Sequence, residues 1–87
     1  MKILKEFALR EIAGEAMLIP IGKTVTEFKG MISLNGVAAF IWSNIEKVET
    51  EDQMVGLICE KYDVSEERAA QDVAGMFAEL RAAGFIE

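Results

Sequence analysis

The side chains that most often perform catalysis or bind metals are scarce in this chain. It contains one cysteine, Cys59, and no histidine. Histidine is the commonest general base near neutral pH and the commonest metal ligand, so Ser-His, Cys-His and His-rich zinc constellations are excluded. Cys59 has no second cysteine to pair with, and its helical surroundings are typical of a small packing residue. We therefore expect no enzymatic activity, no catalytic residue, no metal site and no cofactor.

The backbone at one junction is more informative than these side chains. Between Gly30 and Trp42, the apolar residues change from alternation to near-continuous helical spacing, and the change falls at Asn35. Asparagine is a favoured N-cap residue, so we expect a strand that runs directly into a buried helix at this point. Ile32 and Leu34 should face the core, with Met31 and Ser33 on the opposite face of the strand.

The elements that must position this junction are three strands followed by three helices. Alternating apolar runs predict strands at 7–12, 15–19 and 28–34, with a turn at Ala13–Gly14 and a loop at 22–26 after Pro20. Helical spacing and capping signals predict helices at 37–45, from the Thr50–Gln53 capping box to 62, and from Ser65 to a stop at Gly84. This order predicts an α+β fold of the winged helix-turn-helix type, with one domain over residues 1–87 and a three-stranded antiparallel sheet.

Composition limits the location and the partners of the protein. The chain is 52% hydrophobic, which excludes disorder, yet no apolar run approaches the ~20 residues that cross a bilayer. Charged residues interrupt the first positions, which argues against a secretory signal. We expect a cytoplasmic protein with no membrane partner.

A three-stranded sheet should leave one edge exposed beside the helices. Unpaired N–H and C=O groups on such an edge can bind an extended peptide as an added strand. The same edge could pair with a second copy of the chain and form a homodimer.

The ordered residues resemble the PqqD family, named for a small protein of pyrroloquinoline quinone biosynthesis. The resemblance rests on residues 9–15, 17–20, Leu34–Asn35 with Ile41 and Trp42, 62–64, 72–73, and Leu80 with 84–86. It implies a recognition element for ribosomally made natural products. Such a peptide chaperone binds the leader segment of a precursor peptide and presents it to a modifying enzyme, often a radical SAM enzyme.

The resemblance implies that the leader pairs with the third strand, in the groove between that strand and the third helix. Backbone pairing would supply hydrogen bonds that tolerate different sequences, while apolar leader side chains would enter a pocket beneath Met76 and Phe77. The strand residues implied are Lys29, Gly30, Met31, Ile32, Ser33 and Leu34. The helix residues implied are Ala69, Ala70, Val73, Met76, Phe77 and Leu80.

Two alternative functions follow from the same pattern. A winged-helix order also allows a DNA-binding regulator, whose recognition helix would begin at Ser65-Glu66-Glu67. Residues 46–72 hold three Lys or Arg against nine Asp or Glu, so phosphate repulsion argues against a nucleic-acid partner. The second alternative is a structural accessory subunit that dimerises through an apolar surface.

Overall fold

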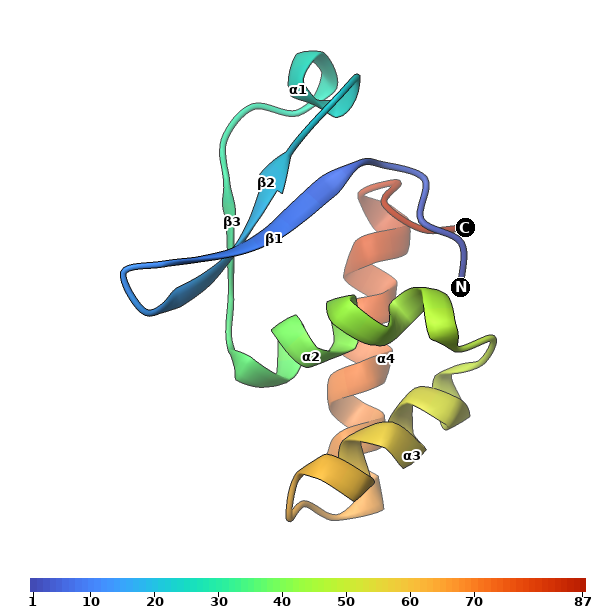
Figure 1. Cartoon of the computed structure of the whole chain (residues 1–87). Helices are drawn as coiled ribbons and strands as arrows, with labels where there is room; N and C mark the ends of the chain where they lie inside the picture. The colour runs from blue at the N-terminus through green and yellow to red at the C-terminus, as the bar shows by residue number, and fades with distance from the viewer.

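The computed structural model describes residues 1–87 and consists of a small sheet followed by helices (Figure 1). The predicted α+β fold is confirmed, with additional short helical turns at 24–27 and 45–47. The elements in chain order are β1 (Phe7–Ile12), β2 (Glu15–Pro20), α1 (Thr24–Glu27), β3 (Ile32–Leu34), α2 (Gly36–Asn44), η1 (Ile45–Lys47), α3 (Glu51–Lys61) and α4 (Glu66–Ala82).

The sheet is antiparallel, with β2 in the centre and β1 and β3 at its two edges. A two-residue turn at Ala13 and Gly14 joins β1 to β2, and both residues have positive φ, +53° and +84°. This is the conformation whose twist suits a tight hairpin, and glycine adopts it without a steric penalty. On the other side of β2, Leu18 lies opposite Ile32 and Ala16 lies opposite Leu34.

The third strand is shorter than predicted. It spans Ile32–Leu34 rather than 28–34, because Gly30 adopts a φ of +106° and interrupts the extended run. Phe28 belongs instead to the end of α1, where its N–H donates to the Thr24 carbonyl at 2.8 Å. Residues 29–31 make no backbone hydrogen bond. The free segment before β3 is therefore irregular rather than a continuous strand.

The predicted loop at 22–26 is also wrong, because α1 begins at Thr24. The Thr24 hydroxyl oxygen accepts a hydrogen bond from the Glu6 N–H at 2.8 Å, and this side chain is only 3% exposed. A polar group that is buried with a partner can hold two segments together. Thr24 thus ties the one-turn helix to the chain that enters β1, a contact that local sequence does not reveal.

The predicted helix caps are confirmed. The Asn35 side chain accepts from the Ala38 N–H at 2.8 Å, and Thr50 and Gln53 form the reciprocal capping box. Ser65 caps α4 by accepting from the Arg68 N–H at 3.1 Å. Gly84 follows the C-cap residue of α4 with a φ of +77°, as expected of a glycine at C′.

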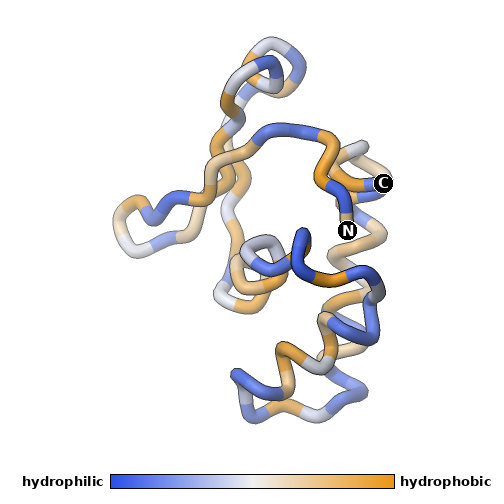
Figure 2. The backbone as a smooth tube through the Cα atoms, turned by 45° about the vertical axis from the view of Figure 1, so that its right-hand side comes forward, coloured by the Kyte–Doolittle hydropathy of each residue, from blue (hydrophilic) through white to orange (hydrophobic).

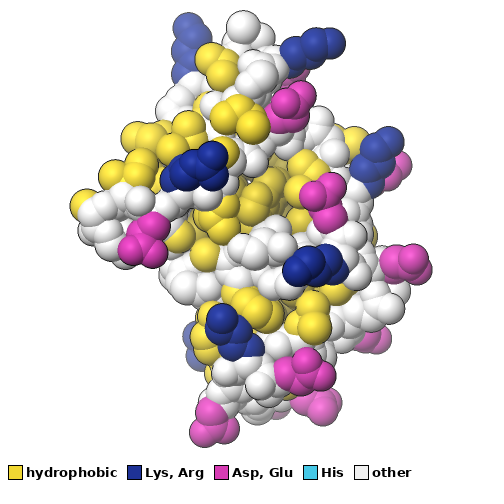
Figure 3. Space-filling view, in the orientation of Figure 1, with side chains coloured by type: hydrophobic (Ala, Val, Ile, Leu, Met, Phe, Trp, Pro, Cys, Tyr) yellow, Lys and Arg dark blue, Asp and Glu magenta, His cyan; other side chains and the backbone are white.

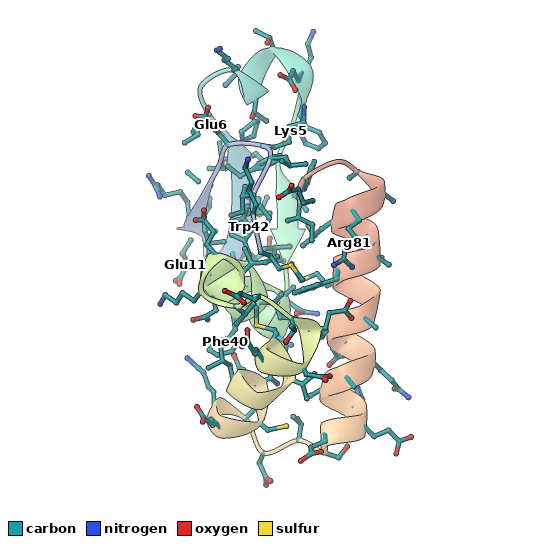
Figure 4. All side chains as sticks on the ribbon, turned by 90° about the vertical axis from the view of Figure 1, so that its right-hand side faces the viewer. Lys5, Glu6, Glu11, Phe40, Trp42 and Arg81 are labelled. Atoms are coloured by element: carbon teal, nitrogen blue, oxygen red, sulfur yellow. The ribbon has the colours of Figure 1, made fainter.

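The core lies where α2, α3 and α4 pack beneath the sheet. Trp42 is 6% exposed and its ring meets that of Phe7 edge-on, with the ring centroids 6.0 Å apart. It lies between the sheet and the helices in Figure 4. The buried hydrophobic residues are Leu18, Ile41, Trp42, Ile45, Val48, Met54, Ile58, Ala69, Val73, Phe77, Leu80, Phe85 and Ile86.

Polar residues occupy the outer ends of the molecule. Figure 2 shows hydrophilic stretches on both sides of the β1–β2 turn and around the turn between α3 and α4. Acidic side chains gather over the lower part of Figure 3, where α3 and the start of α4 lie. This distribution matches the charge asymmetry of the sequence.

The two chain ends lie side by side (Figure 1). Ile3 and Ile86 form an antiparallel bridge, and the Leu4 N–H donates to the Phe85 carbonyl at 2.8 Å. The residues after α4 are thereby held against the entry to β1, with Phe85 in the core. None of the helices is both long enough and apolar enough to span a bilayer.

Candidate functional site

A groove of about 660 Å³ lies between β3 and α4, and we refer to it as the β3–α4 groove. Eleven of its 18 lining residues are hydrophobic, so it suits apolar side chains. The lining consists of Leu18, Phe28, Ile32, Ser33, Leu34, Asn35, Val37, Ala38, Ile41, Arg68, Gln71, Asp72, Gly75, Met76, Glu79, Leu80, Ala83 and Phe85.

One wall of the groove is the strand β3. It pairs with β2 along one side only, so its opposite edge carries no neighbouring strand. Among the six predicted strand residues, Ile32, Ser33 and Leu34 line the groove. The other three, Lys29, Gly30 and Met31, are exposed residues that precede the strand and lie outside the lining. Phe28, which was not predicted, lines the groove beyond them.

The other wall is α4, and here the structure separates the predicted residues into three groups. Met76 and Leu80 line the groove. Ala69, Val73 and Phe77 are at most 1% exposed and face the core instead, while Ala70 is exposed outside the lining. Those three buried side chains pack in the core and do not line the groove as the free chain presents it.

Helical periodicity explains this separation. Residues 69, 73, 77 and 80 follow the core stripe, whereas 68, 71, 72, 75, 76, 79 and 83 form the adjacent stripe that faces β3. Leu80 lies at the boundary, because it is buried in the core and also lines the groove. The spacing of both stripes can be seen in the sequence, but the stripe that faces β3 consists mostly of polar or small residues. The predicted site on this helix consists of apolar residues only, and it does not include six further groove residues: Arg68, Gln71, Asp72, Gly75, Glu79 and Ala83.

The groove has two chemically different ends. β3 and α4 run in opposite directions in Figure 1, so the earlier groove residues of α4 lie toward the end of β3 and the later ones toward its beginning. At the first end, Arg68 and Asp72 form an ion pair, with Nε and Oδ1 3.4 Å apart. At the second end, the rings of Phe28 and Phe85 meet edge-on at 5.7 Å.

The aromatic end is connected to the core. The centroid of the Phe7 ring lies 5.6 Å from that of Phe28 and 4.6 Å from that of Phe85. Trp42 packs against the same Phe7 ring. Edge-on and tilted aromatic contacts of this kind stabilise a cluster beyond its buried area. A molecule bound at this end of the groove would therefore be connected through two rings, Phe28 or Phe85 and then Phe7, to the only tryptophan of the chain.

A second, more polar hollow adjoins the Leu34 end of the groove. Ser33, Leu34 and Asn35 line both, and the Asn35 cap fixes the backbone between them. Glu11 and Glu15, on either side of the β1–β2 turn, also line this hollow. No three His, Cys, Asp or Glu side chains gather anywhere as a metal site. The arrangement suits binding of an extended, partly apolar chain.

Known proteins share both the sequence pattern and the fold. The model of the family described as coenzyme PQQ synthesis protein D (PqqD) matches residues 15–86. Among solved structures, the fold is similar to "TbiB1 in Complex with the TbiA(beta) Leader Peptide", with a TM-score of 0.73 and 24% sequence identity. That alignment covers 100% of this chain and 95% of the other, and it shows a shared fold. A search of curated proteins finds no match.

Proposed function

This chain belongs to the PqqD family, and from that premise we propose that it is a non-catalytic peptide chaperone. It binds the leader segment of a precursor peptide in the β3–α4 groove and presents it to a peptide-modifying enzyme, such as a radical SAM enzyme. The observation that carries the proposal is the apolar groove beside an unpaired strand edge. The similarly folded TbiB1 adds support, since its structure is that of a complex with the TbiA(beta) leader peptide.

Affinity in this proposal comes from backbone pairing. An extended peptide that adds to the free edge of β3 satisfies N–H and C=O groups that otherwise bond only to water. Residues 29–31, whose backbone groups make no backbone hydrogen bond, offer further donors and acceptors just before the strand. Since these bonds involve no side chain of β3, they tolerate different peptide sequences.

Selectivity in this proposal comes from the apolar lining. Side chains that alternate along the bound peptide point toward the groove at every second residue. Ile32, Leu34 and Met76 are only partly buried, so apolar peptide side chains can remove more of their surface from water. Methionine is flexible and polarizable, which allows Met76 to adapt to different partners.

The charge of α4 argues against the DNA-binding alternative. In a winged helix, the recognition helix enters the major groove with its N-terminal residues. Here that end carries Glu66 and Glu67, both exposed. Carboxylates at this place repel phosphates, so the geometry favours a peptide over a nucleic acid.

The proposal can be tested with a displayed library of random peptides selected on the immobilised protein. Binding of synthetic copies is then followed by fluorescence of Trp42, which contacts the groove lining through Phe7. The decisive variant is Met76→Glu, which places a carboxylate in the groove. Its matched control is Ala70→Glu, which adds the same group to an exposed position of α4 outside the lining.

We expect the wild type and Ala70→Glu to bind the selected peptides, and Met76→Glu to lose binding while keeping its helical circular dichroism. Equal binding by all three proteins would show that the peptides bind elsewhere. A wild-type protein that selects no peptide would refute the proposed function.

A homodimer through the β3 edge would compete with peptide binding, because one edge can pair with only one strand. The mass of the protein in solution, measured with and without a selected peptide, tests this directly. Peptide binding should leave a monomer with one peptide. A dimer that persists at saturating peptide would contradict the use of this edge.

A further inference from the structure

The charges within the β3–α4 groove are unbalanced at one position. Three of its lining residues are charged: Arg68, Asp72 and Glu79. Arg68 and Asp72 pair with each other at 3.4 Å, whereas Glu79 forms no ion pair. The groove therefore has one uncompensated charge, a carboxylate near the end of α4.

The surroundings of Glu79 make this end of the groove more negative. Glu79 lies in the last turn of α4, where the helix dipole places a partial negative charge. The basic residue of that turn, Arg81, does not offset it. Arg81 is directed toward α3, with Nη1 3.3 Å from the Glu51 carboxylate and Nε donating to the Glu87 carbonyl at 3.2 Å (Figure 4).

No lysine or arginine of the opposite wall offsets Glu79 either. Leu80 and Ala83 adjoin Glu79 on the chain, the Leu80 carbonyl accepts from the Phe85 N–H, and the Phe85 ring contacts Phe28; none of these lining residues carries a charge. Lys29 follows Phe28, but it is exposed outside the lining and forms no ion pair. The Glu79 carboxylate thus stands at the rim of an aromatic and aliphatic surface without a cationic partner.

We propose that Glu79 determines specificity by selecting a peptide with a lysine or arginine at the position that reaches the Phe28–Phe85 end of the groove. This inference rests on the proposed peptide-binding function. The long apolar stem of such a side chain packs over Phe28 and Ala83, which are not buried in the core, while its charged head reaches the carboxylate. The preferred ligand class is therefore an apolar peptide with a basic residue at one end of its bound segment.

The experiment compares peptides selected from a random displayed library by four full-length proteins. These are the wild type, Glu79→Gln, the charge-inverted Glu79→Lys, and the control Glu60→Gln. Glu60 is an exposed residue of α3 outside the groove, and its substitution changes the net charge by the same amount as Glu79→Gln. Circular dichroism and thermal unfolding verify that all four proteins fold.

We expect wild-type and Glu60→Gln selections to enrich lysine or arginine at one position, and Glu79→Gln to lose this enrichment. Glu79→Lys should enrich aspartate or glutamate at the same position. For one selected peptide, replacing its basic residue with glutamine should weaken binding about two- to fivefold on the wild type, as for an exposed ion pair, and little on Glu79→Gln.

The outcomes separate this inference from the function on which it rests. Peptides that bind the wild type in the groove without a basic preference, or with one that Glu79→Gln retains, overturn the role of Glu79 and leave peptide binding intact. Failure of the wild type to select any peptide overturns both.

Discussion

The two stripes of α4 that meet the rest of the protein differ in what covers them. One stripe, with Val73 and Phe77, is closed off by the core, and these side chains are almost completely buried. The neighbouring stripe, with Asp72, Met76 and Glu79, faces β3 across an open groove. A single helix thus supports the fold with one stripe and offers a binding wall with the next.

The difference arises because the sheet ends at β3. A fourth strand at this edge would cover the adjacent stripe of α4 and continue the apolar layer, but the chain provides only three strands. We infer that a bound peptide supplies the missing strand. Substitutions on the two stripes should therefore affect different properties, stability on one and binding on the other.

The largest expected effect comes from Val73→Glu on the core stripe. Burying an unpaired carboxylate costs several kcal/mol, a large part of the ~5–15 kcal/mol by which a domain is stable. We expect this variant to be largely unfolded in circular dichroism and urea titration. Met76→Glu, three residues away at the groove, should stay folded. Equal loss of structure in both variants would contradict the division between the stripes.

The next largest effect is the difference in stability between two alanine variants, one on each stripe. Phe77→Ala removes a ring that is fully buried and should lower the free energy of unfolding by about 3–5 kcal/mol. Met76→Ala removes a partly buried side chain and should cost less than about 2 kcal/mol. Both values come from urea denaturation. Similar losses would mean that Met76 belongs to the core after all.

A smaller effect is expected at the junction between the strand and α2. Asn35→Ala removes the cap on the Ala38 N–H and should destabilise the protein by about 1 kcal/mol. Because Asn35 also lines the groove, selected peptides should bind this variant more weakly. Asn35→Asp keeps an N-cap oxygen and serves as the control. An unchanged melting temperature in Asn35→Ala would show that the cap contributes little.

The smallest effect is expected for Arg68→Ala at the groove rim. Its pair with Asp72 is exposed and spans one helical turn, an arrangement worth about 0.3–0.5 kcal/mol. The free energy of unfolding, measured by thermal denaturation, should fall by no more than this amount. The loss should be smaller at high salt, because salt screens the ion pair. A loss above about 1 kcal/mol would show that the pair stabilises the wall and is not simply part of its solvated rim.

Local signals predict most of the fold because they act over a few residues. Asn35, Thr50 and Ser65 each bond to an N–H three positions later, so the residue type and its place in the pattern suffice. Thr24 is different, because its partner is the Glu6 N–H, 18 positions earlier. No local pattern indicates such a contact, which is why the segment of α1 resembles a loop in the sequence.

Residue types and their spacing are enough to establish the order of the three strands and the three longer helices, the helix caps and the apolar stripe of α4. These follow from periods of two or about 3.6 residues and from single residues, which need no knowledge of distant parts. Contacts between distant elements were needed to learn that β3 begins at Ile32, that Phe77 lies in the core, and that Glu79 lies in the groove. The spacing of residues along a helix shows which side chains share a stripe. Whether that stripe packs in the core or lines an open groove depends on where the sheet ends.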